Sequence, residues 1–168
     1  MRLETPKGVE KLQTALHVKA KGAPGFRFYL LYDKVHRRDV LSFADALCSA
    51  HGGAPGVDGQ TFEDISDYGT DRWLDELAEE LRTRTYQPQP VRRIWIPKAN
   101  GGQRPLGIPT IRDRVVQTAA VLVLEPIFEA DLQPEQYAYR SGKSALDAVR
   151  RVHALVNSGH TDVVDADL

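Results

Sequence analysis

Several residue types are scarce in this 168-residue chain, and each scarcity excludes a class of protein. The single cysteine, Cys48, excludes an internal disulfide framework and favours a reducing compartment, with Cys48 itself a buried structural thiol. The longest apolar run, residues 115–128, is short and interrupted by polar residues and proline, so it cannot span a bilayer. The N-terminus carries no apolar signal-peptide core. These features predict a cytoplasmic globular protein.

Net charge is also small, at −1, which taken alone argues against a nucleic-acid partner. The charge is nevertheless segregated along the chain. Residues 39–80 contain eleven acidic residues and one arginine, whereas residues 82–114 contain eight basic residues and one aspartate. A basic segment of this kind is a candidate contact for phosphates, and an ordinary solvated face is the alternative.

The hydrophobic periodicity predicts an α+β fold, with helices surrounding one β-hairpin. An Asn-Gly turn within residues 99–102 joins two arms of period two, which is typical of a hairpin. The helix at residues 70–86 is expected to begin at Thr70 or Asp71, and the helix at 112–129 is apolar enough to pack on more than one side. The predicted elements are helices over 29–50, 70–86, 112–129 and 144–159, a glycine-rich loop over 51–61, hairpin arms over 91–98 and 103–109, and a strand over 161–168.

The hairpin carries the chemistry that is easiest to interpret. Lys98 and Arg104 lie near its tip on opposite arms, where both cations can converge on one ligand. An arginine presents a planar fork to phosphate oxygens and a lysine a point charge, so the pair suits a polyphosphate. An exposed hairpin with ordinary charges is the alternative.

Residues 142–144 read Gly-Lys-Ser before a predicted helix, which resembles a phosphate-binding loop. That motif requires an earlier glycine where this chain has Tyr137, and a preceding strand that is not predicted, so we reject it. Arg140 and Lys143 still lie near a helix N-terminus, which could hold a phosphate.

The chain closes on "DVVDADL". Asp165 and Asp167 are two residues apart, so a strand would place both carboxylates on one face, where they could hold Mg²⁺ for phosphoryl or nucleotidyl transfer. Two carboxylates at this spacing also occur by chance. The five histidines show no metal-ligand spacing.

Three strings together carry a family resemblance. They are "GAPGVDGQTFEDI" (53–65), "YQPQPVRRIWIPKANGGQRPLGIPTIRDRVVQTAAVLVLEPIFEADLQPEQYAYRSGKSALDAV" (86–149) and "VVDADL" (163–168). In this order they resemble the first blocks of the reverse transcriptases encoded by bacterial group II introns. The resemblance implies an N-terminal extension at 1–28, mobile and bounded by "KGAPG", a fingers region at 29–160, and a truncated first palm strand at 161–168 of a right-hand polymerase.

The resemblance also implies residue roles. Lys98 and Arg104 match the fingertip residues that grip the triphosphate of the incoming dNTP. Asp167 matches the first palm aspartate, a catalytic ligand of Mg²⁺. The backbone carbonyl of Leu168 would be the second Mg²⁺ ligand from this segment. The implied partners are intron RNA as template, a DNA primer and dNTP, with no membrane. The candidate contacts to the nucleic-acid backbone are Arg92, Arg93, Arg112, Arg114, Arg140 and Lys143.

The chain departs from the family pattern in two ways. Tyr139, Ser141 and Lys143 replace the usual Phe, Pro and Arg of the template-contacting block. The Tyr-x-Asp-Asp motif does not occur, so this chain alone is expected to be inactive, because two-metal catalysis needs the whole set of carboxylates.

Two other functions remain open, a non-catalytic RNA-binding module that aids splicing and a decayed or truncated reading frame. The parent could also be a related CRISPR-associated, retron or diversity-generating enzyme. An unpaired palm strand would expose an edge at 161–168 and allow self-association.

Overall fold

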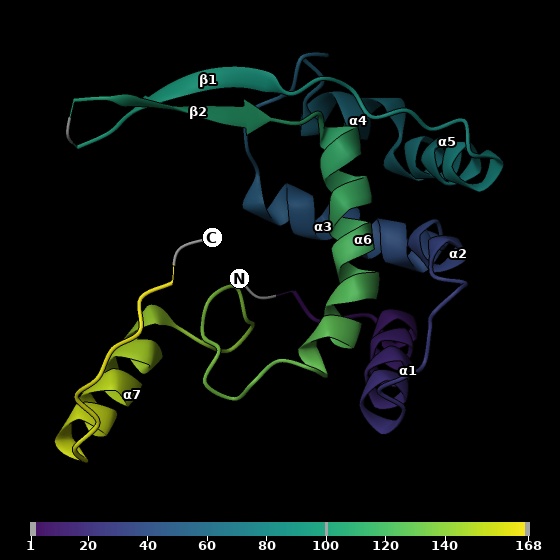
Figure 1. The fold of residues 1–168 in the computed structure, drawn as a ribbon. Coiled ribbons are helices and arrows are strands. Elements are labelled where there is room, and N and C mark those ends of the chain that lie inside the picture. The colour runs from purple at the N-terminus through teal and green to yellow at the C-terminus, as the bar shows by residue number, and fades with distance from the viewer. Residues whose placement is uncertain (1–2, 100, 167–168) are drawn as a thin grey trace. The chain divides into compact units, whose positions relative to one another are not determined.

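The structure is a computed structural model and describes residues 3–99 and 101–166. Within them the chain forms helices and one two-stranded antiparallel sheet, as the α+β prediction required (Figure 1). Two compact units are present, residues 1–130 and 131–168. The boundaries expected at residues 28 and 160 delimit functional regions and stay predictions. The first unit contains α1 (Lys7–Gly22), α2 (Tyr32–Val35), α3 (Arg38–His51), α4 (Phe62–Tyr68), α5 (Thr70–Thr83), β1 (Arg92–Pro97), β2 (Gln103–Ile108) and α6 (Ile111–Glu129), and the second contains α7 (Ala145–Asn157).

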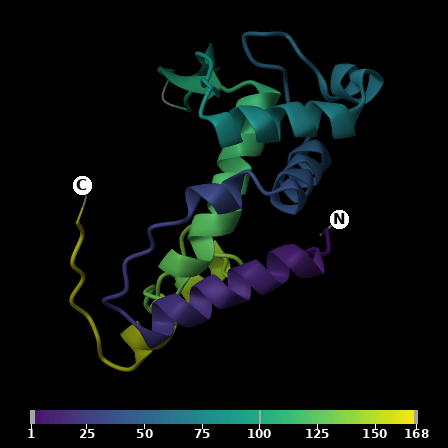
Figure 2. The same cartoon turned by 90° about the vertical axis from the view of Figure 1, so that its right-hand side faces the viewer.

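Helix α6 is the centre of the first unit. It contacts α1, α2 and α3, which confirms the prediction that this apolar helix packs on more than one side. The hairpin leaves from its N-terminal end, and α1 crosses nearer its C-terminal end (Figures 1 and 2). The side chains of α6 that are buried are Ile111, Asp113, Val115, Ala119, Leu122 and Val123.

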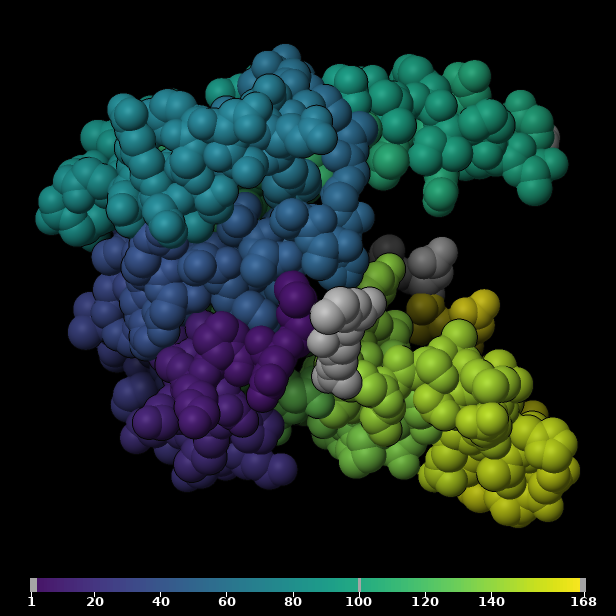
Figure 3. All heavy atoms as spheres, turned by 180° about the vertical axis from the view of Figure 1, so that it is seen from behind, coloured from purple at the N-terminus to yellow at the C-terminus, as the bar shows by residue number. Residues whose placement is uncertain are grey.

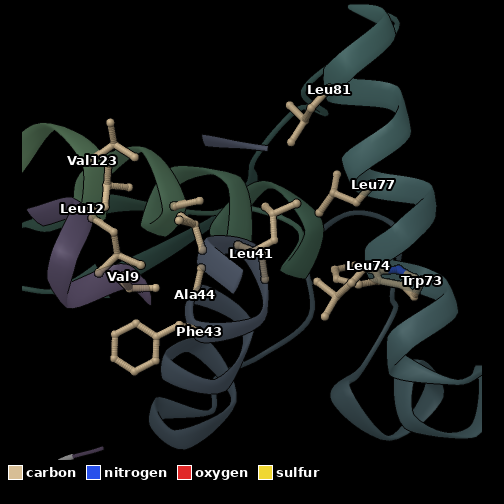
Figure 4. Close-up of a cluster of buried hydrophobic side chains, with 14 of the residues drawn as sticks. Val9, Leu12, Leu41, Phe43, Ala44, Trp73, Leu74, Leu77, Leu81 and Val123 are labelled. Carbon is tan, nitrogen blue, oxygen red and sulfur yellow. The ribbon is translucent and has the colours of Figure 1, made fainter. Parts of the chain in front are cut away.

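The core is formed by one apolar stripe from each long helix (Figure 4). Four residues recur at helical spacing along α5 and are buried, as the pattern of residues 70–86 predicted. The predicted N-cap is displaced by one residue, because Gly69 occupies that position at φ +102. The buried stripe residues of the other two helices are Val9, Leu12, Leu16 and Ala20 on α1, and Val40, Leu41, Phe43 and Ala44 on α3.

The N-terminal residues, expected as a mobile extension, contain α1, which packs in the same unit as α3 and α6. Two polar contacts support this packing. Pro126 lies inside α6 and has no N–H to offer the carbonyl of Leu122, and Gln13 donates its Nε2–H to that carbonyl at 3.1 Å. His17 Nδ1 lies 3.1 Å from the Pro126 carbonyl. The polar side chains of α1 thus satisfy part of the α6 backbone.

The single helix predicted over 29–50 is interrupted, and this prediction was wrong. Arg37 has extended backbone angles (φ −61, ψ 134) between α2 and α3. Its guanidinium binds Asp39 in the first turn of α3, with Nε–Oδ1 and Nη2–Oδ2 distances of 3.0 and 2.6 Å. Apolar spacing continues across residues 36–37, so periodicity alone does not reveal the break.

The loop over 51–61 is present, with Gly52, Gly53 and Gly59 at positive φ as its composition predicted. It ends at α4, a short helix that we did not predict. Thr61 and Asp64 form a reciprocal capping box there. A Thr-x-x-Asp sequence is the local signal for such a start, although the apolar spacing after it is too short to indicate a helix.

In the second unit, α7 begins after Ser144, which forms a capping box with Asp147, and Gly159 follows its end at φ +95. The predicted helix is confirmed. The predicted strand over 161–168 is not formed in its described part, because residues 161–166 have no regular structure and pair with no other strand. A strand is stable only when a neighbour satisfies its backbone, and no such neighbour exists in the described residues.

Candidate nucleotide and nucleic-acid interface

The hairpin projects from the end of α6 and makes few contacts beyond its own two strands (Figure 3). Its ladder pairs Arg92 with Ile108 at the base and Pro97 with Gln103 at the last strand position. The Lys98 N–H then donates to the Gly102 carbonyl at 2.7 Å, so the pairing continues one step beyond β1. The turn is therefore wider than the predicted two-residue Asn-Gly turn. Asn100 itself lies outside the described residues.

Lys98 and Arg104 share one face of this ribbon. Arg104 lies directly opposite Ile96, and residues directly opposite each other in an antiparallel ladder point to the same side. Lys98 follows Ile96 by two residues and therefore points to that side as well. Both cations are exposed, and neither has an ion pair among the described residues. We call this side, with Ile94, Ile96 and Leu106 between the charges, the cation face.

Arg92 and Arg93 occupy opposite faces because they are adjacent on β1. Arg92 is half-buried on the side of the cation face, near the base of the hairpin, whereas Arg93 is exposed on the other side. The two arginines, which we predicted together as nucleic-acid contacts, therefore cannot bind the same strand in the same way.

Asp113 joins both arms of the hairpin to α6. Its side chain is 3% exposed and accepts hydrogen bonds from the Tyr86 hydroxyl and, at 3.1 Å, from the Gln89 N–H, both on the segment that enters β1. It also accepts from the Thr110 hydroxyl at 2.8 Å, on the segment that leaves β2. Burial, together with the hydrogen bond to Asp113, raises the pKa of Tyr86. One carboxylate thus holds the hairpin at its base.

Arg114 holds the glycine-rich loop. Its Nη1 and Nη2 groups donate to the carbonyls of Gly52 (3.2 Å) and Ala54 (2.8 Å), and its guanidinium lies over the ring of Phe62. A Cβ at Gly56 would lie 2.6 Å from the Thr110 backbone, so only glycine permits this approach. The loop and the base of the hairpin are therefore packed against the same turn of α6.

Arg112 forms an ion pair with Glu80 of α5. The triplet of residues 112–114 therefore ties α5, the hairpin and the loop to the start of α6. We predicted Arg112 and Arg114 as contacts to nucleic acid, and the structure assigns both side chains to contacts within the chain. Neither the spacing nor the charge of the triplet distinguishes these two uses.

In the second unit, Arg140 and Lys143 also contact their own loop. Arg140 Nη1 donates to the carbonyls of Gln133 (2.6 Å) and Gln136 (3.2 Å), and Lys143 Nζ to that of Pro134 (3.2 Å). The N-terminus of α7 is capped by Ser144, and the carboxylate of Asp147 lies in its first turn. That negative charge opposes a phosphate at the helix end.

Cys48 is half-buried, as predicted for a structural thiol, and lies 3.3 Å from the Thr118 hydroxyl. Burial raises the pKa of its thiol, which makes the thiolate scarce at neutral pH. Thr110 and Asp113 form a Thr-x-x-Asp sequence, which is a local signal for the start of α6, but no pattern indicates the bonds from Tyr86 and Gln89.

The predicted metal ligands Asp167 and Leu168 lie outside the described residues. Asp165 is described and exposed. Among residues 3–99 and 101–166, no group of three or more His, Cys, Asp or Glu side chains is placed to hold a metal ion. No helix in that part of the chain has the length and apolar content needed to cross a membrane.

Comparison with known proteins gives the class of the chain. No family model matches it. It is 36% identical to protein YkfC of Escherichia coli over 166 residues, which is 95% of this chain and 43% of YkfC. It is 34% identical to the group II intron-encoded protein LtrA of Lactococcus lactis over 91 residues, 54% of this chain and 15% of LtrA. It is 30% identical to the putative COX1/OXI3 intron 1 protein of Saccharomyces cerevisiae over 96 residues, 57% of this chain and 11% of that protein.

The chain is thus an α+β protein with an exposed cationic hairpin. It is homologous to intron-encoded proteins. These intron-encoded relatives support the resemblance to group II intron-encoded reverse transcriptases and maturases that the three strings indicated. It spans less than half the length of each of the curated relatives named above.

Proposed function

We propose that the first unit is the fingers region of an RNA-directed DNA polymerase and that its hairpin grips the triphosphate of an incoming dNTP. The observation that carries the proposal is the ladder register, which puts Lys98 and Arg104 on one face of an exposed ribbon. A forked guanidinium and an ammonium on one face complement the charge and the spread oxygens of a triphosphate.

The anchoring at the base supports the same proposal. Binding energy is used well when the binding groups are held in place beforehand. The Asp113 network fixes both arms of the hairpin, so the two cations are presented in a defined direction. An ordinary exposed hairpin would not need a buried carboxylate at its base.

Asp167 and the Leu168 carbonyl remain our proposed Mg²⁺ ligands, with Asp167 as the catalytic carboxylate. A bound Mg²⁺ would supply charge neutralisation at the phosphates. The intron RNA template and DNA primer are likewise proposed partners. Of the basic residues predicted to bind them, Arg93 and Lys143 are exposed and form no ion pair among the described residues, and Lys143 Nζ donates to the Pro134 carbonyl of its own loop.

Nucleotide binding by the chain tests the proposal. We expect Lys98→Ala and Arg104→Ala each to weaken dNTP binding about 10- to 100-fold, because each removes a charge-assisted contact of about 1.5–3 kcal/mol. Arg93→Ala removes an equal charge from the opposite face and is the matched control. Equal losses in all three variants would show general electrostatic attraction and contradict a triphosphate grip.

A non-catalytic RNA-binding module is the alternative, and the exposed Arg93 of β1 is compatible with it. In that case the Arg92→Ala/Arg93→Ala double variant should weaken RNA binding and reduce its dependence on salt. Lys98→Ala should then have no effect on nucleotide binding, since no nucleotide site would exist. The two functions therefore differ in which variant affects which ligand.

A further inference from the structure

The side of the hairpin opposite the cation face carries a large uncovered aromatic ring. Trp95 is 55% exposed and lies directly opposite Pro105 in the ladder. Arg93 precedes it by two residues on the same strand, so both side chains point to the same side. Arg93 pairs with Gly107, which has no side chain. We call Arg93, Trp95 and Pro105 the tryptophan face.

The ladder register explains why these side chains are uncovered. On this side, β2 contributes Gln103, Pro105 and Gly107. The two that lie directly opposite Trp95 and Arg93 are Pro105 and Gly107, which are too small to cover an indole or a guanidinium. A Cβ at Gly107 would lie 2.9 Å from a methyl group of Val91, so a larger residue there is disfavoured. The hairpin also makes few contacts with the helices of its unit. Packing inside the chain therefore does not account for the tryptophan.

We propose that the tryptophan face binds single-stranded RNA by stacking a base on the Trp95 ring, with Arg93 contacting the adjacent phosphate. An exposed aromatic ring beside a cation is the combination that holds unpaired bases without reading their sequence. A duplex offers no free base face and would not use the ring. On this face Arg93 supplies the positive charge that a polyanionic partner requires.

This inference rests on the proposed function only for the identity of the RNA as template, because the tryptophan face does not include Lys98 or Arg104. The pleat of the ribbon separates the two faces. A nucleotide on the cation face and an unpaired RNA strand on the tryptophan face would therefore occupy different sides of the same hairpin. Neither ligand should displace the other.

Fluorescence of the full chain with a short unstructured RNA oligonucleotide is the direct test. The chain has two tryptophans, and Trp73 is buried. The fluorescence of the wild type minus that of Trp95→Phe therefore reports the emission of Trp95. We expect RNA to quench this difference signal. Trp95→Ala should weaken RNA binding about 5- to 100-fold, with Trp95→Phe between it and the wild type because a smaller ring still stacks.

Two matched variants separate stacking from charge. Leu106→Ala removes a comparably exposed apolar side chain (45%) from the cation face and should leave RNA affinity unchanged. Arg93→Ala should reduce the slope of log K against log salt by about 0.7, whereas Trp95→Ala should leave the slope unchanged. Trp95 is exposed, so its replacement does not disturb the core.

The inference is overturned if RNA does not quench Trp95, if Leu106→Ala and Trp95→Ala weaken binding equally, or if a duplex RNA binds and quenches as well as the single strand. Quenching by a protein partner and not by RNA would likewise overturn it. Retained dNTP binding in the same samples would show that the cation face functions and that only the tryptophan face was misassigned. Loss of dNTP binding with intact RNA stacking would overturn the proposed function alone.

Discussion

The hydroxyl of Tyr86 donates a hydrogen bond to the carboxylate of Asp113, 27 residues later in the chain. The intervening residues form the whole hairpin, so this bond closes its base. The same carboxylate accepts from the Gln89 N–H and the Thr110 hydroxyl. Three donors around one buried carboxylate make Asp113 a positioning residue for everything that the hairpin carries.

We expect Asp113→Ala to destabilise the first unit by about 3 kcal/mol, because it leaves the three donors Tyr86, Gln89 and Thr110 without their acceptor. Tyr86→Phe removes a single donor and should cost about 1.5–3 kcal/mol. Urea denaturation measures both losses. In variants that still fold, the fluorescence anisotropy of Trp95 should fall as the hairpin gains freedom. Unchanged anisotropy in both variants would show that the network stabilises the unit without orienting the hairpin.

A second prediction concerns the proline in α6. Gln13→Ala should cost about 1 kcal/mol, because the Leu122 carbonyl loses the donor that replaces the missing N–H of Pro126. In a Pro126→Ala background the helix supplies its own N–H, and the same change should cost close to nothing. A double-mutant cycle by thermal or urea denaturation measures this difference. Equal costs in the two backgrounds would contradict the contact.

A third prediction uses the end of α5. Arg84 has a left-handed backbone (φ 60, ψ 29) at the helix C-cap, where glycine has no steric penalty. We expect Arg84→Gly to stabilise the unit by about 1 kcal/mol, measured as a higher thermal midpoint. Arg82→Gly, two residues earlier inside the helix, is the matched control and should destabilise by about 1 kcal/mol. Destabilisation by both changes would show that the side chain of Arg84 matters more than its backbone.

A fourth prediction concerns pH. Hydrogen bonds from the Arg37 guanidinium lower the pKa of Asp39 below its ordinary value. The pair therefore stabilises the fold above the unfolded-state pKa of about 3.9 and loses this contribution as the pH falls through the lower folded-state pKa. Asp39→Asn should lower the urea midpoint at neutral pH, and the difference from wild type should shrink in acid. Asp131→Asn, an exposed aspartate, should show no such pattern.

A fifth prediction concerns the residues before the C-terminus. Val163 and Val164 are 87% and 91% exposed and pair with nothing in the described residues. We expect this segment to promote self-association, visible as a mass that rises with concentration in light scattering. Val164→Lys should reduce it, whereas Val18→Lys, at an exposed valine on α1, should not. A mass that is constant across concentrations in the wild type would contradict this prediction.

The sequence predicted the features that depend on near neighbours along the chain. The buried stripe of α5, the hairpin and the capping box at Ser144 all follow from local spacing and local hydrogen bonds. The break at Arg37 was not predicted, since apolar spacing continues through it. Conversely, residues 161–166 were predicted as a strand that is not formed. Local sequence fails here because a strand depends on pairing partners that its own residues do not supply.

For the candidate site, the predicted hairpin is present, and the convergence of Lys98 and Arg104 on one ligand stays a prediction. Arg112 and Arg114, which we predict as contacts to nucleic acid, bind Glu80 and the loop carbonyls within the chain. The sequence does not distinguish an arginine that binds a phosphate from one that binds a carbonyl. Only the position of a distant acceptor decides between these uses, and that position is a property of the fold.

The attachment at Asp113 has a mechanical consequence. A ribbon that is clamped at its base and free along its length behaves as a cantilever, whose displacement under thermal force grows with distance from the clamp. Displacements of the hairpin should therefore be largest near Lys98 and the turn and smallest beside Thr110. Adjustment at the tip would then leave the packing of α6 undisturbed.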